Sequence, residues 1–257
     1  MMYKPTILPY WHTNPYKEQI KQVGIYNDTL SVDNSEIKVL IQREPPQVLN
    51  IVDAIIKNQG KYDLILAWNE DVLNNCSNAK KFMFGDCWLE KEFNIEDKQN
   101  YISFLTSNKN FTPGHSLRQN VYELLQKNKR IGNHKIISIK TPPRITNKDV
   151  IFENCSFSIT IENVKINNFF TEKIIDCFMS KTIPIYCGCP NISEFFNPNG
   201  IIFFDNEEQL INILTNLSTD EYKNRIQYVE ENFIFAKKYC NFFERVDEEV
   251  KSFLNNK

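Results

Sequence analysis

Short apolar runs alternate with segments of helical periodicity along the first hundred residues. The runs are rich in β-branched and aromatic residues, a composition typical of strands. The predicted strands are ILPYW (7–11), IKVLIQ (37–42), YDLILAW (62–68) and KFMFG (81–85). Residues 47–58 follow two prolines and place valine and isoleucine side chains on one face, which predicts a helix between two of these strands.

The same alternation continues, with stronger signals, through the second half of the chain. The predicted strands there are 101–107, 135–140, 157–163, 182–188 and 200–204, and the predicted helices are 115–128 and 171–181. From Thr219 onward the chain has no glycine or proline, which predicts tail helices. Strands separated by helices imply right-handed crossovers and parallel sheets covered on both faces. The fold class is therefore α/β, with two Rossmann-like lobes facing a cleft.

The boundary between the two lobes is expected in the segment LEKEFNIEDKQ (89–99), which is charged and poor in branched residues. We therefore expect an N-terminal lobe over residues 1–98 and a C-terminal lobe, with the tail helices, over residues 99–257. A chain of 257 residues accommodates two such domains.

Charge and hydrophobicity narrow the class of protein. Thirty basic residues against 32 acidic ones give a net charge of −2, without the basic excess typical of nucleic-acid binding, so no nucleic-acid partner is expected. No apolar run approaches the ~20 residues that cross a bilayer, so no integral membrane segment is expected. We expect a cytoplasmic protein.

The cysteines and histidines do not form a recognisable metal or disulfide pattern. Seven cysteines without a C-x-x-C pair favour reduced, buried thiols. Cys187 and Cys189 are one residue apart, and the three histidines are scattered, so zinc is not expected.

Candidate chemistry lies in the loops that follow predicted strands, because open parallel sheets bind ligands at the carboxyl ends of their strands. Gly114 and Arg118 stand at the start of the helix after strand 101–107, and a helix N-terminus with an arginine suits an anion. Thr171, Glu172 and Lys173 begin a later helix. A lysine is unfavourable at a helix N-terminus, and an anionic ligand would compensate it. Helix capping alone would also explain the threonine and the glutamate.

The run IENVKINNFFTEKIIDCFMSKTIPIYCGCPNISEFFNP resembles the donor-binding signature of the alpha-1,3-fucosyltransferase family. Members of that family read approximately F-E-N-S, a short polar loop, Y-x-T-E-K and then x-P-I/V-Y-x-G-x-P. The spacing from Glu162 to Lys173 fits without a gap, and SFLTSNKNFTPGHSLR resembles the family's arginine-bearing helix start. The similarity covers roughly residues 101–205. Two positions depart from the pattern, since Val164 replaces the serine and Phe169 replaces the tyrosine.

The resemblance implies an inverting, GDP-fucose-dependent glycosyltransferase of the GT-B type, without a cofactor or essential metal. By this resemblance the N-terminal lobe binds a saccharide acceptor and the C-terminal lobe binds the nucleotide sugar. Arg118 and Lys173 would neutralise the diphosphate, Glu172 would hold the ribose and Asn163 would lie along the donor. Phe169 would occupy the place of a donor-contacting tyrosine without its hydroxyl, which leaves a different nucleotide sugar open. Action in the cytoplasm of a microbe or of a virus-infected cell fits best.

The acceptor side is less well marked. An inverting transfer needs a carboxylate that takes the proton from the attacking hydroxyl. Glu44, in the loop after strand 37–42, corresponds to the family's presumed base, and Glu70 and Asp71 after strand 62–68 are alternatives. Trp11 and His12, with Tyr10, could stack on an acceptor sugar or could pack within the lobe. A saccharide-binding protein that has lost turnover is a further alternative.

Overall fold

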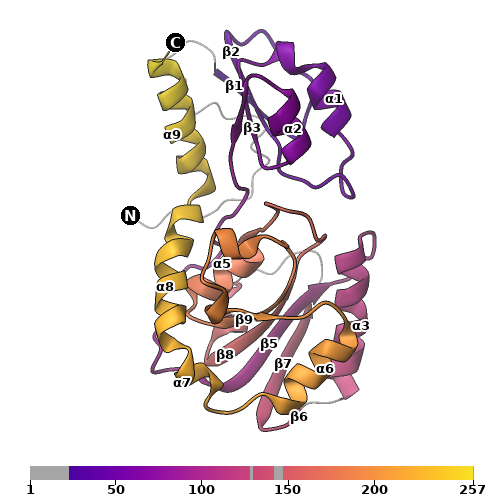
Figure 1. Cartoon of the computed structure of the whole chain (residues 1–257), viewed down its shortest axis with the longest axis vertical. Coiled ribbons are helices and arrows are strands. Elements are labelled where there is room, and N and C mark those ends of the chain that lie inside the picture. The colour runs from indigo at the N-terminus through magenta and orange to yellow at the C-terminus, as the bar shows by residue number, and fades with distance from the viewer. Residues whose placement is uncertain (1–22, 128–129, 142–146, 257) are drawn as a thin grey trace. The chain divides into compact units, whose positions relative to one another are not determined.

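The computed structural model describes residues 23–127, 130–141 and 147–256, and divides into two compact units. Unit 1 consists of residues 1–84 and 241–257, and unit 2 of residues 85–240. The described part of the chain confirms an α/β fold with two largely parallel sheets, one in each unit (Figure 1).

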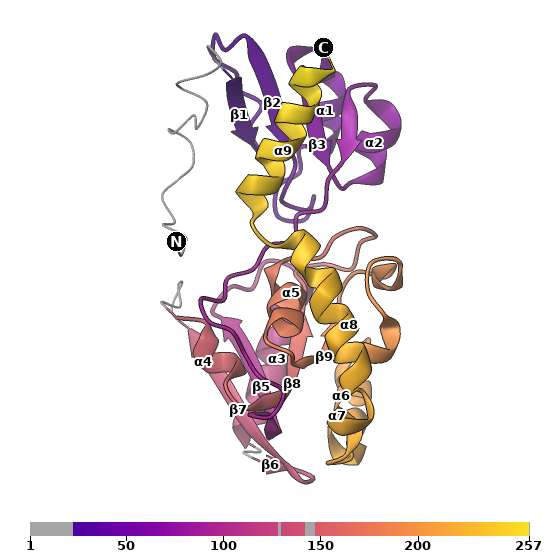
Figure 2. The ribbon, with the colours of Figure 1, turned by 90° about the vertical axis from the view of Figure 1, so that its left-hand side faces the viewer.

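Unit 1 contains a four-stranded parallel sheet in the order β1-β2-β3-β4. Its strands are β1 (Val23–Asn27), β2 (Ile37–Ile41), β3 (Leu64–Ala67) and β4 (Ala79–Lys81). Its helices are α1 (Val52–Lys57), the 3-10 helix η1 (Gln59–Lys61), α2 (Glu70–Asn75) and α9 (Phe242–Asn255). Because side chains alternate along each strand, one face of the sheet packs on α1 and α2 and the other on α9, which Figure 2 shows lying along the strands.

Unit 2 contains a six-stranded sheet in the order β10-β9-β8-β5-β7-β6, parallel except for the short β6–β7 hairpin. Its strands are β5 (Gln99–Ser107), β6 (Arg130–Ile131), β7 (His134–Thr141), β8 (Cys155–Ile161), β9 (Ile183–Cys187) and β10 (Ile202–Phe203). Its helices are α3 (Pro113–Lys127), α4 (Asp149–Phe152), α5 (Glu172–Met179), η2 (Ile192–Glu194), η3 (Pro198–Gly200), α6 (Glu207–Asn216), α7 (Glu221–Asn224), α8 (Ile226–Ala236) and η4 (Lys237–Tyr239). Every residue of β8 and β9 is buried, as expected for central parallel strands.

The observed division differs from the expected one at both ends of unit 2. The boundary lies at Gly85 rather than after residue 98, and α9 belongs to unit 1 rather than to the C-terminal lobe. The reason is burial, because Phe242, Val246 and Val250 of α9 pack in the same core as Val39 and Leu66 of the first sheet. An amphipathic tail helix does not reveal from its own sequence which of two sheets it covers.

Two of the expected elements in unit 1 differ from the observed ones, and one observed strand was not expected. Strand β1 was not expected, because VGIYN contains a glycine and an asparagine, and the predicted strand 7–11 lies outside the described residues. The strand expected at 81–85 ends at Lys81. The helix expected over 47–58 begins only at Val52, because the Pro45 carbonyl accepts hydrogen bonds from Val48 and Leu49 in a separate turn.

Candidate functional site

The carboxyl end of β8 in unit 2 anchors the start of helix α3. The Gly114 amide donates to the Asn163 carbonyl over 2.9 Å. A Cβ atom at position 114 would lie 1.9 Å from the Glu162 carbonyl oxygen and 2.7 Å from that of Asn163. Glycine is therefore required here because two backbone segments approach more closely than any side chain allows.

Arg118, one turn further along α3, is directed at the same segment. Its guanidinium donates to the Ile161 carbonyl over 2.5 Å and to Asn163 Oδ1 over 2.8 Å, and the residue is only 6% exposed. Burial lowers the pKa of Arg118, and Glu162 and Glu172 act in the opposite direction. The structure thus brings the predicted Arg118 and Asn163 together, with Arg118 already bonded to the protein.

Helix α5 begins on the other side of this segment. Thr171 caps the helix by accepting from the Lys173 amide, and Glu162 accepts from the Thr171 amide over 3.0 Å and from its hydroxyl over 2.8 Å. Lys173 Nζ lies 2.9 Å from Thr171 Oγ1, 3.2 Å from Glu172 Oε1 and 3.5 Å from Glu162 Oε2. The lysine expected to need an anionic ligand is thus compensated by two carboxylates of the protein itself.

Two buried residues that the sequence analysis missed complete this cluster. Lys148 Nζ and Asp176 Oδ2 form an ion pair of 2.5 Å, and both side chains are buried. Asp176 follows Glu172 by four residues and so lies on the same face of α5, a spacing that could have drawn attention to it. Lys148 precedes the four-residue helix α4, and nothing in the sequence around it marks it.

The charges of the cluster balance. Burial alone would raise the pKa of Glu172, but Lys173 and Lys148 together lower it to about 2, so this carboxylate is ionised at neutral pH. We define the donor cluster as three basic and three acidic side chains: Arg118, Lys148, Lys173, Glu162, Glu172 and Asp176. An anionic ligand therefore meets a site whose positive charges are already compensated. Among the three basic side chains of the donor cluster, Lys173 is the most accessible, with a quarter of its side chain exposed.

Two further positions of the motif that carries the family resemblance lie close against the protein's own side chains. Phe169 is 1% exposed, so its ring belongs to the interior and does not offer a surface to a ligand in this structure. Gly188 has Tyr186 Oη and Glu162 Cγ within 2.6 Å of where a Cβ would be. The close approach at this glycine is thus to the protein's own side chains.

His115 is a polar residue of this region that the sequence analysis did not select. Its Nδ1 lies 2.5 Å from Thr112 Oγ1, and its ring contacts that of Phe111, which is more than half exposed. Burial, together with the nearby charges of Arg118, Lys109 and Lys173, lowers the pKa of His115 to about 4. The imidazole is therefore neutral at physiological pH.

In unit 1 the predicted Glu44 is half-buried in the loop after β2. Asp28, which follows β1 in the left-handed conformation (φ 49°), accepts from the amides of Arg43 at 2.8 Å and Glu44 at 3.2 Å. Burial raises the pKa of Asp28 to about 6. Sequence analysis missed Asp28 because β1 itself was missed. Glu70 is exposed at the start of α2.

The remaining residues expected on the acceptor side are exposed or lie outside the described residues. Asp71 is exposed, and its amide donates to the Asn69 cap of α2. Trp11 and His12 lie outside the described residues, so their expected role stays a prediction. Over residues 23–127, 130–141 and 147–256, no group of three or more His, Cys, Asp or Glu side chains is arranged to hold a metal ion. No helix among them is long and apolar enough to span a bilayer.

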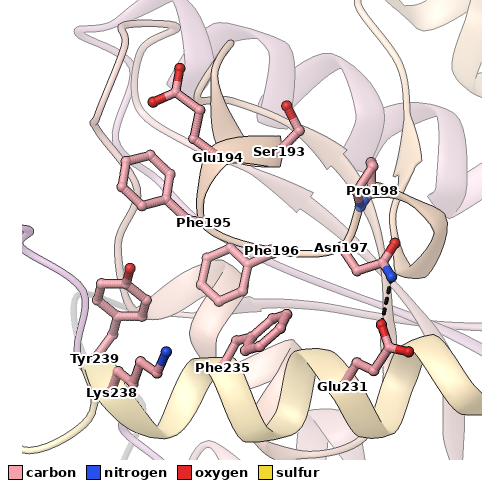
Figure 3. Close-up of a pocket in the computed structure, with 10 residues that line it drawn as sticks. All are labelled: Ser193, Glu194, Phe195, Phe196, Asn197, Pro198, Glu231, Phe235, Lys238 and Tyr239. Carbon is pink, nitrogen blue, oxygen red and sulfur yellow. Dashed lines mark hydrogen bonds between the residues drawn. The ribbon is translucent and has the colours of Figure 1, made fainter.

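A separate pocket of about 550 Å³ lies between residues 193–198 and the helical segment 231–239 of unit 2. Figure 3 shows the rings of Phe195, Phe196 and Tyr239 along it, together with the Asn197–Glu231 hydrogen bond of 2.6 Å. No member of the donor cluster lines this pocket.

Two α/β units, each with a largely parallel sheet, give this chain the architecture of the GT-B fold class. Residues 95–251 match the model of glycosyltransferase family 10 (fucosyltransferase), C-terminal part. The chain belongs to this family, as the resemblance indicated.

Individual relatives agree with this assignment. An alpha-(1,3)-fucosyltransferase FucT of Helicobacter pylori is 27% identical over 165 residues, which are 58% of this chain and 34% of that protein. The chain thus spans about a third of the length of this curated relative. A crystal structure of an alpha1,3-fucosyltransferase superposes with a TM-score of 0.52 at 17% identity, covering 85% of this chain and 74% of the other. A trehalose-6-phosphate synthase, studied for glycosyl transfer with retention, superposes with a TM-score of 0.53 at 10% identity, covering 84% of this chain and 68% of the other. These two likenesses show the fold.

Proposed function

We propose that this protein transfers fucose from GDP-fucose to a saccharide hydroxyl with inversion, forming an α-1,3 linkage. The observation that carries the proposal is the convergence of Arg118, Asn163, Glu172 and Lys173 on the end of β8 and the start of α5. These are the residues that the family resemblance places around a nucleoside diphosphate.

The chemistry of this transfer needs a fixed positive charge beside the departing phosphate. Negative charge builds on the diphosphate as the bond to the anomeric carbon breaks, and a preorganised cation stabilises that charge. Lys173 supplies it by exchanging its contacts with Glu162 and Thr171 for phosphate oxygens. Arg118 holds Asn163 and the end of β8 in place, and its positive charge adds to the field at the diphosphate. We propose that no metal ion is needed, so that transfer continues in the presence of a chelator.

On the acceptor side, we propose that Glu44 takes the proton from the attacking hydroxyl. Asp28 bonds to the Arg43 and Glu44 amides and so fixes the loop that carries this carboxylate. Glu70, exposed at the amino end of α2, is the alternative base. Replacing Glu44 with Gln should abolish transfer and leave GDP affinity unchanged, whereas Glu70→Gln should leave both close to wild type.

Calorimetric titration with GDP tests the donor site. Lys173→Met should weaken GDP binding by about tenfold to a hundredfold, the range expected when one charged contact of about 1.5–3 kcal/mol is lost. Lys91→Met is the matched control, because Lys91 is an exposed lysine of the same unit that pairs with Glu153. Equal GDP affinity of Lys173→Met and wild type would contradict the assignment.

The identity of the nucleotide sugar is a separate question, because Phe169 replaces a hydroxyl-bearing residue and is buried. Stabilisation against thermal unfolding by GDP, UDP and ADP distinguishes the candidates, since a ligand stabilises only the protein that binds it. Of these three nucleotides, we expect only GDP to raise the melting temperature. Stabilisation by UDP instead would indicate the same scaffold with another donor, and GDP binding without any transfer would indicate a saccharide-binding protein.

A further inference from the structure

The ammonium group of Lys148 is buried beneath the donor cluster. The residue is 8% exposed and its Nζ lies 2.5 Å from Asp176 Oδ2, whose residue is fully buried. The other oxygen of Asp176 accepts from the Trp88 amide over 2.8 Å, and the ammonium lies 5.1 Å from the centre of the Trp88 ring. The lysine is thus fixed on all sides and has no direct access to a ligand.

Glu172 and Asp176 are one turn apart on the same face of α5, so a cation bonded to Asp176 also faces Glu172. The other charged groups around Glu172 come from three elements. They are Lys173 and Asp176 on α5, Glu162 at the end of β8, and Arg118 on α3. Of the cations, Lys173 is the one that the proposed donor would draw away, whereas Lys148 and Arg118 stay in place when it does.

We infer that Lys148 is a positioning residue of the donor site, which keeps the carboxylate of Glu172 ionised and oriented when Lys173 turns to the diphosphate. This inference rests on the proposed function, in which Glu172 accepts hydrogen bonds from the nucleotide's ribose. In a protonated Glu172 one of the two carboxylate oxygens would become a hydrogen-bond donor, which reduces its capacity to accept from the ribose. Because Glu172 is only 8% exposed, water does not supply the missing stabilisation of its charge.

The electrostatics of Glu172 support this role. Burial raises its pKa, and Lys173 and Lys148 outweigh burial to bring it to about 2. If Lys148 is removed, one of these two opposing charges is lost, so Glu172 becomes protonated at a higher pH. Affinity for GDP should then fall, because Lys148 no longer stabilises this carboxylate when Lys173 turns to the diphosphate.

The test uses a variant that removes the charge without leaving an unpaired carboxylate. Lys148→Met alone would strand Asp176 in the interior, so the informative protein is the double variant Lys148→Met/Asp176→Asn, in which an amide oxygen still accepts from Trp88. Two controls are matched to it: Asp176→Asn alone retains the cation, and Lys148→Arg retains the charge with a different shape.

Two measurements on these proteins decide the question. The first is the titration of the Glu172 carboxyl carbon by NMR without ligand, followed from pH 7 downward, whose midpoint should move to higher pH by about one pKa unit only in the double variant. The second is the dissociation constant for GDP at pH 7, expressed as the ratio of variant to wild type. This ratio should be about tenfold for the double variant, the equivalent of one pKa unit, and less than about twofold for both controls.

The outcomes separate the two proposals. A folded double variant whose Glu172 titrates as in wild type, or whose GDP affinity equals that of wild type, overturns the role of Lys148. If wild type fails to bind GDP, the proposed function fails, and the NMR titration still decides whether Lys148 controls the ionisation of Glu172.

Discussion

Replacement of Gly114 by alanine is the sharpest structural test of the donor site. The new methyl group would lie 1.9 Å from the Glu162 carbonyl oxygen and 2.7 Å from that of Asn163, and both are backbone atoms. Helix α3 must therefore move away from the end of β8. That movement breaks the 2.9 Å hydrogen bond from the Gly114 amide and displaces Arg118 from its acceptors.

The magnitude follows from these contacts. Overpacking costs typically 1–3 kcal/mol, a lost hydrogen bond costs about 1 kcal/mol, and alanine regains up to about 1 kcal/mol through its better helix propensity. We expect a net loss of about 3 kcal/mol, because the clash is with backbone. In a protein of this size that loss lowers the melting temperature by roughly 6–12 °C.

Differential scanning calorimetry with and without GDP measures both consequences. Gly60→Ala is the control, since a Cβ at Gly60 meets nothing within 4 Å, and it should change stability by less than about 0.5 kcal/mol. GDP affinity should fall in Gly114→Ala and stay unchanged in Gly60→Ala. The reasoning is refuted if Gly114→Ala has the same melting temperature as wild type, because the backbone at Gly114 would then not be in contact with the backbone at Glu162 and Asn163.

Three further variants test the buried groups. Burial raises the pKa of Asp28 from 3.8 to about 6, so its ionisation destabilises the folded protein as the pH rises through this range. In urea unfolding at pH 8, Asp28→Asn should therefore recover up to about 3 kcal/mol in the free energy of unfolding. Below pH 3.5 the same substitution should have no such effect. Burial lowers the pKa of Lys98 from 10.5 to about 8. The free energy of unfolding should therefore rise by about 3 kcal/mol as the pH is raised from 8 to 10.5, and Lys98→Met should abolish that rise in urea unfolding. Phe170 is fully buried against Phe195 and Tyr239, so Phe170→Ala should cost about 3–5 kcal/mol in the free energy of unfolding; a loss below 1 kcal/mol would contradict its placement.

The sequence predicted the central strands and helices α3 and α5 of unit 2 well, because each signal there is local. Strands β8 and β9 are continuous apolar runs, and α5 begins at a threonine cap followed by a glutamate. The order of these elements also predicted that Arg118 and Lys173 would meet at one edge of the sheet. The structure connects both of them to the three residues 161–163.

What the sequence did not predict depends on contacts between distant residues. Lys148 and Asp28 are surrounded by ordinary polar neighbours in the chain, and their importance comes from Asp176 and from the Arg43 and Glu44 amides, 28 and 15–16 residues away. Phe169 looked like a ligand contact by its place in a motif, and its burial is decided by the packing around it.

Because α9 supplies Phe242, Val246 and Val250 to the core of the first sheet, that core is complete only after α9 has been synthesised. Residues 85–240, by contrast, hold all of their own sheet. At about 5–20 residues per second on the ribosome, the second unit can therefore fold while the first still exposes an uncovered apolar face. The chain departs in this way from the usual order in which the N-terminal domain matures first, and its nascent form should depend on chaperones until α9 emerges.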